Sequence, residues 1–135
     1  MYCIILAERE ESNMSDTSNN NMLGKLANMQ QMIVDYKEKM KEKITQEQMN
    51  SIEEIQTKIE KLINILPKEV YNLKKDDYMI CSSQLQEILD SIRNIKQELE
   101  ESYSGLEKMK ITNGIEKLGR EVEICRNKAM NKVNK

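Results

Sequence analysis

The sequence predicts an all-α protein in which long amphipathic helices form a helical hairpin or coiled-coil bundle, preceded by a disordered N-terminal tail. Two observations carry this prediction. Apolar residues recur at alternating spacings of three and four along most of the chain, which places them on one face of a helix. The one short apolar run typical of a strand, Tyr78-Met79-Ile80-Cys81, has no second run with which to build a sheet.

Residues 1–21 are expected to form the disordered tail. They end in the polar stretch Ser18-Asn19-Asn20-Asn21, which has no apolar period. The apolar run of residues 2–7 is too short for a membrane span or a signal-peptide core, and no basic residue precedes it. Met14 is a candidate alternative start, and Asn21 is suited to cap the helix that follows.

Residues 22–66 form the first predicted helical region. Its apolar stripe contains Met22, Leu26, Met29, Ile33, Tyr36, Met40 and Ile44, and resumes with Ile52, Ile55, Ile59, Leu62 and Leu66. The stripe slips by about one residue near Gln48, and Thr45 with Gln48 fits a capping box that would start a new helix. The sequence leaves open one helix of roughly 67 Å, at ~1.5 Å per residue, or two helices broken near Thr45.

A hinge is expected over residues 67–77. Pro67, the only proline, disfavours helix at the residue before it and lacks the N–H that a continuing helix needs. It is also suited to open a short helix that runs to Leu73. Lys74-Lys75-Asp76-Asp77 then has the composition of a polar turn, so the two helical regions should fold back on each other as a hairpin.

Residues 78–130 form the second helical region, which starts near Tyr78 or at Ser83, where Ser83 and Gln86 fit a capping box. One apolar stripe contains Leu85, Ile88, Ile92, Ile95, Leu99, Leu106 and Met109, with Ser102 at one of its positions, and a second contains Ile111, Ile115, Leu118, Val122, Cys125 and Ala129. The two stripes are out of phase, and Gly114 lies at the shift. A break is therefore expected near residues 112–114, and residues 131–135 should fray.

The composition argues against an enzyme. The chain has no His, so imidazole bases and imidazole metal ligands are absent. Cys3, Cys81 and Cys125 are isolated and lack the spacing of a zinc site. Adjacent acidic pairs such as Glu53-Glu54 point in different directions on a helix. We therefore predict no catalytic, cofactor-binding or metal-ligating residues, and no cofactor.

The charge pattern and the cysteine count bear on partners and location. The chain carries 21 basic and 23 acidic residues, interspersed along its length, whereas a nucleic-acid binder would show a basic stripe. No segment approaches the length of a membrane span. An odd cysteine count without a secretory signal indicates a reducing compartment. We expect an intracellular protein, cytoplasmic or nuclear, that does not bind nucleic acid and has no integral membrane segment.

The apolar stripes carry the first functional hypothesis, because helices in so short a chain must bury them against each other or against another chain. The first hypothesis is that the protein is a coiled-coil subunit or adaptor of a larger complex. The complex would be of the vesicle- or organelle-tethering, kinetochore or transcription-coactivator type. The partners would be other helical subunits or a second copy of this chain. The candidate interface residues are Leu26, Ile33, Ile55, Ile59, Leu62, Ile88, Ile92, Ile95, Leu99, Leu118 and Val122. Gln48 and Ser102 occupy positions in the stripes where a polar residue can set the helix register.

Two other hypotheses remain open. The first is a self-contained three- or four-helix bundle that acts as a regulator, for example a co-chaperone. Ile88-Leu89-Asp90-Ser91-Ile92 resembles a stretch of the second helix of BAG domains, which implies such a bundle; the resemblance covers these five residues. The Arg-Lys pairs that follow in that family are absent here, since residues 97–101 are mostly acidic. The second is a self-assembling homo-oligomeric coiled coil.

The distribution of methionine along the chain also has a functional implication. Five of the ten methionines are concentrated in the first helical region, namely Met22, Met29, Met32, Met40 and Met49. Flexible Met side chains suit adaptable grooves that accept a partner helix, and they serve equally well as core fillers. Met32 and Val34 flank the main stripe and widen it, and Met49 lies beside Gln48.

Overall fold

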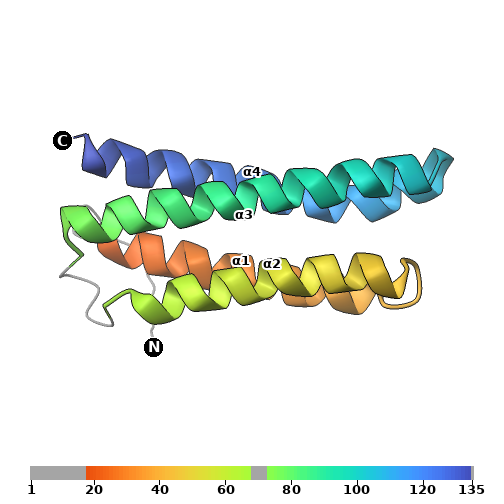
Figure 1. Cartoon of the computed structure of the whole chain (residues 1–135), viewed down its shortest axis with the longest axis horizontal. Coiled ribbons are helices and arrows are strands. Elements are labelled where there is room, and N and C mark those ends of the chain that lie inside the picture. Colours follow the sequence, from red (N-terminus) through yellow and green to blue (C-terminus); the bar gives the residue numbers. More distant parts are fainter. Residues whose placement is uncertain (1–17, 68–72, 135) are drawn as a thin grey trace, which may run out of the picture.

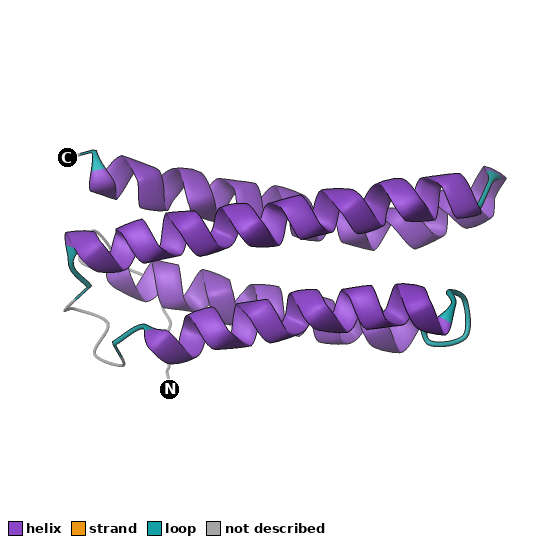
Figure 2. Cartoon of the chain, viewed as in Figure 1, coloured by secondary structure: helices purple, strands orange, loops and turns teal. Residues whose placement is uncertain are grey.

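The computed structural model of the protein describes residues 18–67 and 73–134, and within these ranges the chain is helical and contains no strand (Figure 2). The predicted all-α fold is confirmed. The four helices are α1 (Ser18–Met40), α2 (Gln46–Ile65), α3 (Lys75–Ser102) and α4 (Gly105–Val133). Each helix packs against the next in the chain, and α4 packs against α1. The result is an antiparallel bundle rather than a single hairpin.

Figure 1 shows the pair α1 and α2 lying along the pair α3 and α4. The α1–α2 loop, residues 41–45, and the α3–α4 turn, residues 103–104, lie at the same end of the bundle, which we call the loop end. The start of α1 and the end of α4 lie at the opposite end. The contact between α3 and α4 is the most extensive in the bundle.

The predicted apolar stripes form one continuous core. Almost every stripe residue of α1, α2 and α3, and every residue of the second α4 stripe, is buried in a single cluster to which all four helices contribute. Burying a Leu or Ile side chain stabilises the fold by about 1.5–3 kcal/mol relative to leaving it exposed. The helices are therefore held together mainly by their own stripes.

The first helical region is two helices, which decides between the alternatives left by the sequence. Thr45 caps α2 through the predicted capping box: its Oγ1 accepts a hydrogen bond from the Gln48 backbone N–H (3.1 Å), and the Gln48 Oε1 accepts one from the Thr45 N–H (3.0 Å). These bonds satisfy donors that the first turn of a helix leaves free. The slip in the stripe near Gln48 is a loop and not a stutter in one long helix.

Both helical regions begin earlier than predicted. Helix α1 starts at Ser18, four residues before Met22, while residues 1–17 lie outside the described residues. Helix α3 starts at Lys75 and not near Tyr78 or Ser83. The Asp77 carboxylate accepts a hydrogen bond from the Lys74 N–H (2.8 Å), and acidic residues are favourable in the first turn of a helix. Lys75-Asp76-Asp77 is thus a helix start rather than the end of the hinge.

The proline acts as predicted at the end of α2. Leu66 has an extended backbone, with φ −82° and ψ 149°, as expected for a residue before proline. The helix ends at Ile65. The short helix predicted from Pro67 to Leu73 falls largely on residues 68–72, which lie outside the described residues.

The break predicted near residues 112–114 is wrong, because α4 runs without interruption through these residues. The chain turns instead at Tyr103 and Ser104, and Gly105 adopts a positive φ of 64°, a conformation that favours glycine. The phase shift between the two stripes is absorbed at this turn. Residues 131–133 also belong to α4, so the predicted fraying does not begin at residue 131.

Because the chain turns at residues 103–104, the last two residues of the first stripe of the second region are exposed and not buried. Leu106 and Met109, predicted to continue it, are 73% and 63% exposed. Because they follow the turn, they lie on α4, whose buried face is set by the second stripe. Ser102 is exposed as well.

The two polar stripe residues meet at the loop end. Gln48 is 3% exposed, and its Nε2 donates a hydrogen bond to the Ser102 Oγ (3.1 Å) while its Oε1 accepts one from the Tyr103 hydroxyl (2.9 Å). One buried amide therefore joins the cap of α2 to the end of α3. Such a directional contact favours one register of α2 against α3 within the chain. The register role predicted from the sequence concerned a self-assembling coiled coil.

Removing this amide is expected to destabilise the bundle. The Gln48→Ala variant should lose about 1–3 kcal/mol of unfolding free energy, because it removes the cap contact and leaves polar partners without their buried acceptor and donor. Gln46→Ala is the matched control, since the Gln46 amide bonds only to Asn50 on the surface. Urea unfolding followed by circular dichroism measures both. Equal small losses would contradict a structural role for Gln48.

Candidate interaction surface

The eleven residues predicted to form a protein interface all lie inside the bundle. Leu26, Ile33, Ile55, Ile59, Leu62, Ile88, Ile92, Ile95, Leu99, Leu118 and Val122 are buried in the core cluster. The stripes meet within the chain, so these side chains present no surface to another protein. An interface on the folded bundle must use other residues.

The described cysteines are buried too. The Cys125 thiol donates a hydrogen bond to the Met22 sulfur (3.3 Å), and Cys81 is equally enclosed. Burial raises the pKa of Cys81 to about 12 and the pKa of Cys125 to about 11. Because the thiolate is the reactive form, both are poor nucleophiles at neutral pH. Cys3 lies outside the described residues.

Within residues 18–67 and 73–134, no group of three or more His, Cys, Asp or Glu residues is placed to hold a metal ion. Over the same part of the chain, no helix combines the length and the hydrophobicity that crossing a bilayer requires.

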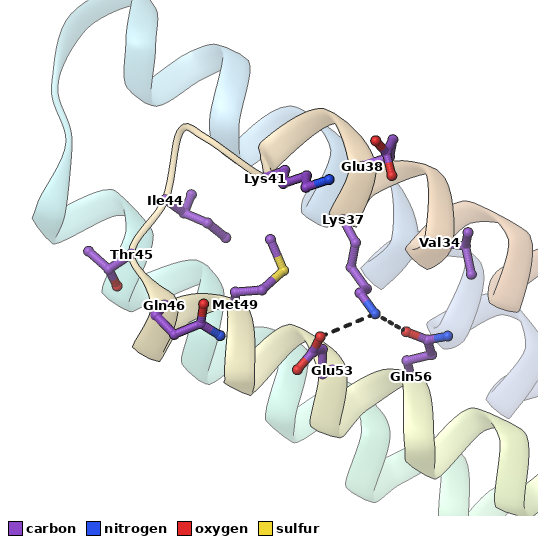
Figure 3. A pocket seen from close by; sticks show the side chains of 10 residues that line it. All are labelled: Val34, Lys37, Glu38, Lys41, Ile44, Thr45, Gln46, Met49, Glu53 and Gln56. Atoms are coloured by element: carbon purple, nitrogen blue, oxygen red, sulfur yellow. Dashed lines mark hydrogen bonds and ion pairs between the residues drawn. The ribbon is translucent and has the colours of Figure 1, made fainter.

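A surface groove lies between α1 and α2, beside the α1–α2 loop (Figure 3). Its volume is about 390 Å³, and it is open to solvent. It is lined by Val34, Lys37, Glu38, Lys41, Ile44, Thr45, Gln46, Met49, Glu53 and Gln56. Val34, Ile44 and Met49 supply an aliphatic surface, and the side chains of Ile44 and Met49 lie next to each other in Figure 3.

A polar network closes the groove on the side away from the loop. The Lys37 ammonium donates a hydrogen bond to the Gln56 Oε1 (2.8 Å) and forms an ion pair with the Glu53 carboxylate (3.4 Å). Further along, the Gln30 amide donates to the Glu60 carboxylate (2.9 Å), which also accepts from the Gln56 amide (3.3 Å). The contacts of Lys37 and Gln30 cross from α1 to α2 and hold the two helices together beside the groove, whereas the bond from Gln56 to Glu60 lies within α2.

The rim next to the loop carries charges of both signs. Lys41 is exposed and forms no ion pair with any described residue. Helix α2 begins at the same place, with Gln46 and Glu47 in its first turn, so the Glu47 carboxylate offsets the partial positive charge of the helix N-terminus. The Glu38 side chain points away from α2 (Figure 3), and Glu53 is paired with Lys37. The groove therefore matches an aliphatic side chain, and its charged lining residues balance, with Lys37 and Lys41 against Glu38 and Glu53.

Sequence reasoning missed this surface, although it contained a signal. Val34 and Met49 are apolar residues out of phase with the stripe, and such residues end up at the edge of the buried face. Other exposed apolar side chains are scattered over the bundle, namely Ile65, Met79, Ile80, Leu106, Met109, Ile124 and Met130. Of these, Leu106 and Met109 lie three residues apart near the start of α4.

The fold alone does not identify a function, because four-helix bundles support many unrelated activities. The functional argument has to rest on the surface just described. No protein-family model, no curated protein and no solved structure matches this chain.

Proposed function

We propose that the protein is a non-enzymatic adaptor, a prefolded helical bundle that binds another protein through its surface within a larger intracellular assembly. This proposal rests on one observation: the eleven residues predicted to form an interface are all buried in the chain's own core. The bundle thus needs no partner to cover its stripes, and the groove between α1 and α2 remains available as a binding surface.

This observation favours the self-contained bundle over the two coiled-coil alternatives. A coiled-coil subunit or a homo-oligomer that used the stripes as its interface would first have to open the bundle. Opening would expose core residues such as Ile55, Ile92 and Leu118, each at a cost of about 1.5–3 kcal/mol. A partner would have to recover that whole cost, whereas binding at the groove requires no opening.

The groove favours a partner segment that presents aliphatic side chains. Val34, Ile44 and Met49 offer the apolar contact, and Lys41 and Glu38 can each pair with an opposite charge on the partner. Electrostatic complementarity of this kind contributes to the selection and orientation of a partner.

The purified chain should be a monomer. Size-exclusion chromatography with light scattering, under reducing conditions, should give the formula mass of 15.8 kDa across a concentration series. The melting temperature should not depend on protein concentration, because a bundle that closes on itself has no association step. A dimer, or a melting temperature that rises with concentration, would contradict the self-contained bundle and favour a coiled coil shared between chains.

The same preparations test binding. A protein that co-purifies specifically with the wild type should be lost with Met49→Glu, which places a charge among the aliphatic groove residues. It should be retained with Met130→Glu, since Met130 is exposed on α4, away from the groove. Equal binding by both variants would show that the partner uses another surface.

A further inference from the structure

We propose that the exposed side of α4 lies on the surface of an anionic lipid membrane. A second stripe on this helix, which we call the outer stripe, follows the spacing of three and four that places residues on one face. It consists of Leu106, Lys110, Asn113, Lys117, Arg120, Ile124, Lys128 and Asn131. The outer stripe is separate from the groove between α1 and α2, so the inference goes beyond the proposed function and does not depend on it.

The outer stripe is open to solvent along its whole length. All eight of its residues are exposed, including the large aliphatic side chains of Leu106 and Ile124. From Leu106 to Asn131 the helix rises roughly 37 Å, at ~1.5 Å per residue, and α4 runs the length of the bundle (Figure 1). A line of side chains on one face of such a helix can contact a planar surface at every turn.

The charges within the outer stripe are all positive. Lys110, Lys117 and Lys128 form no ion pair with any residue that the structure describes. Arg120 is the exception in the stripe, since it pairs with Glu116 (3.6 Å). Three ammonium groups in one row are therefore available to an anionic partner.

The four acidic residues of α4 lie beside the outer stripe and not in it. Glu116 is turned toward α3, where its carboxylate also pairs with Lys96 (3.2 Å). Glu123 lines a hollow between α3 and α4, and Glu121 is half-buried. Glu107 lies in the first turn of α4, where an acidic residue favours the helix start. The carboxylates of α4 thus do not interrupt the row of positive charge.

The fold places most of the negative charge away from the outer stripe. Helix α4 has 7 basic and 4 acidic residues, whereas α3 has 3 and 7. Helix α3 packs on the side of α4 that carries Gly119 and Arg126, which is opposite the outer stripe. With the stripe on a surface, the carboxylates of α3 are separated from it by the diameter of α4, roughly 10 Å. This exceeds the Debye length of about 8 Å at physiological ionic strength, so their repulsion is screened.

The mixture of lysine and aliphatic side chains favours a lipid surface over a nucleic acid. Basic residues on an amphipathic helix attract anionic headgroups, and aliphatic side chains beside them leave water at the boundary with the acyl chains. Leu106 and Ile124 would gain no such contact on a phosphate backbone. Nucleic-acid surfaces instead use arginine and stacked aromatic residues, whereas the outer stripe has no aromatic residue and its single arginine is paired.

Flotation with lipid vesicles tests the inference on the full-length chain. The wild type should bind vesicles of phosphatidylcholine and phosphatidylserine, should not bind vesicles of phosphatidylcholine alone, and should be released at high salt. Each lysine removed should weaken binding about fivefold. The triple variant Lys110→Gln, Lys117→Gln and Lys128→Gln should therefore bind roughly 100-fold more weakly than the wild type.

Two further variants separate the position of the charge from its amount, and charge from the aliphatic contact. The matched control Lys61→Gln, Lys75→Gln and Arg93→Gln changes the net charge equally at exposed residues of α2 and α3, and it should bind like the wild type. Leu106→Ser with Ile124→Ser should weaken vesicle binding several-fold and keep its salt dependence. The replaced side chains are all exposed, so the melting temperature by circular dichroism should be unchanged in every variant.

Three outcomes would overturn the inference. One is a wild type that binds the phosphatidylserine vesicles no better than pure phosphatidylcholine. Another is an equal loss of binding in the two triple variants, which would make net charge and not the outer stripe responsible. The third is binding of the wild type to duplex DNA in place of the vesicles, which would make this side of α4 a nucleic-acid interface.

Discussion

The variant Ile92→Asp is expected to be unfolded at 25 °C. Ile92 is 2% exposed and lies in the most extensive helix contact of the bundle, where its Cγ2 would come within 3.3 Å of a Cβ added at Gly119 on α4. The substitution removes a buried aliphatic side chain and places a carboxylate without a partner in its position. We expect a loss of about 4–5 kcal/mol or more, which is comparable to the whole stability of a small domain.

Circular dichroism in a urea series measures this loss, and Ile80→Asp is the matched control on the same helix. Ile80 is 40% exposed, so its aspartate remains hydrated and the helical signal should persist. The opposite result for Ile92→Asp, full helicity with loss of a binding partner, would mean that Ile92 faces another protein, as the interface prediction from the sequence supposed. Ile95→Asp should behave like Ile92→Asp, since Ile95 is also buried.

The sequence predicts the fold class because helical periodicity is a local property. Each stripe, such as Ile52, Ile55, Ile59 and Leu62, can be identified without knowledge of the rest of the chain, and all four residues are buried as expected. Capping is equally local, and the box formed by Thr45 and Gln48 is confirmed. The pairing between stripes depends on residues that are far apart in the chain. The periodicity alone therefore does not distinguish burial within the chain from burial against a partner.

The turn between α3 and α4 shows a second limit. A phase shift between two stripes can be absorbed anywhere between their last and first members, here between Leu99 and Ile111. The sequence offered Gly114 as the natural place, because glycine weakens helices. The chain uses Gly105, where a positive φ is required, so Leu106 and Met109 pass to the exposed side of α4.

The groove was beyond sequence reasoning for the same reason. Its shape depends on contacts between residues that are distant in the chain, such as Gln30 with Glu60 and Lys37 with Gln56. None of these polar residues belongs to a motif, and on a helix surface each has the composition of an ordinary solvated face. Only Val34 and Met49, apolar and out of phase, pointed to this side of α1 and α2.

Gly114 has a role that explains why a helix breaker sits inside α4. A Cβ added at this position would lie 2.6 Å from the Tyr36 Cδ1 and 2.9 Å from its Cε1. The Tyr36 ring cannot easily yield, because it is buried in the core and its hydroxyl donates a hydrogen bond to the Ile111 carbonyl oxygen. Gly114→Ala should therefore destabilise the bundle by about 1–3 kcal/mol, even though alanine improves helix propensity by about 1 kcal/mol.

Two comparisons separate this steric effect from propensity. Gly24 lies in α1 with no atom within 4 Å of an added Cβ, so Gly24→Ala should stabilise the protein by about 0.5–1 kcal/mol. The two Gly→Ala substitutions are thus expected to have opposite signs in the same urea experiment. In a Tyr36→Leu background the ring is gone, and Gly114→Ala should become neutral or stabilising. If Gly114→Ala stabilised the wild-type chain, α4 would not approach the Tyr36 ring as closely as described, and the α1–α4 contact would have to be redrawn.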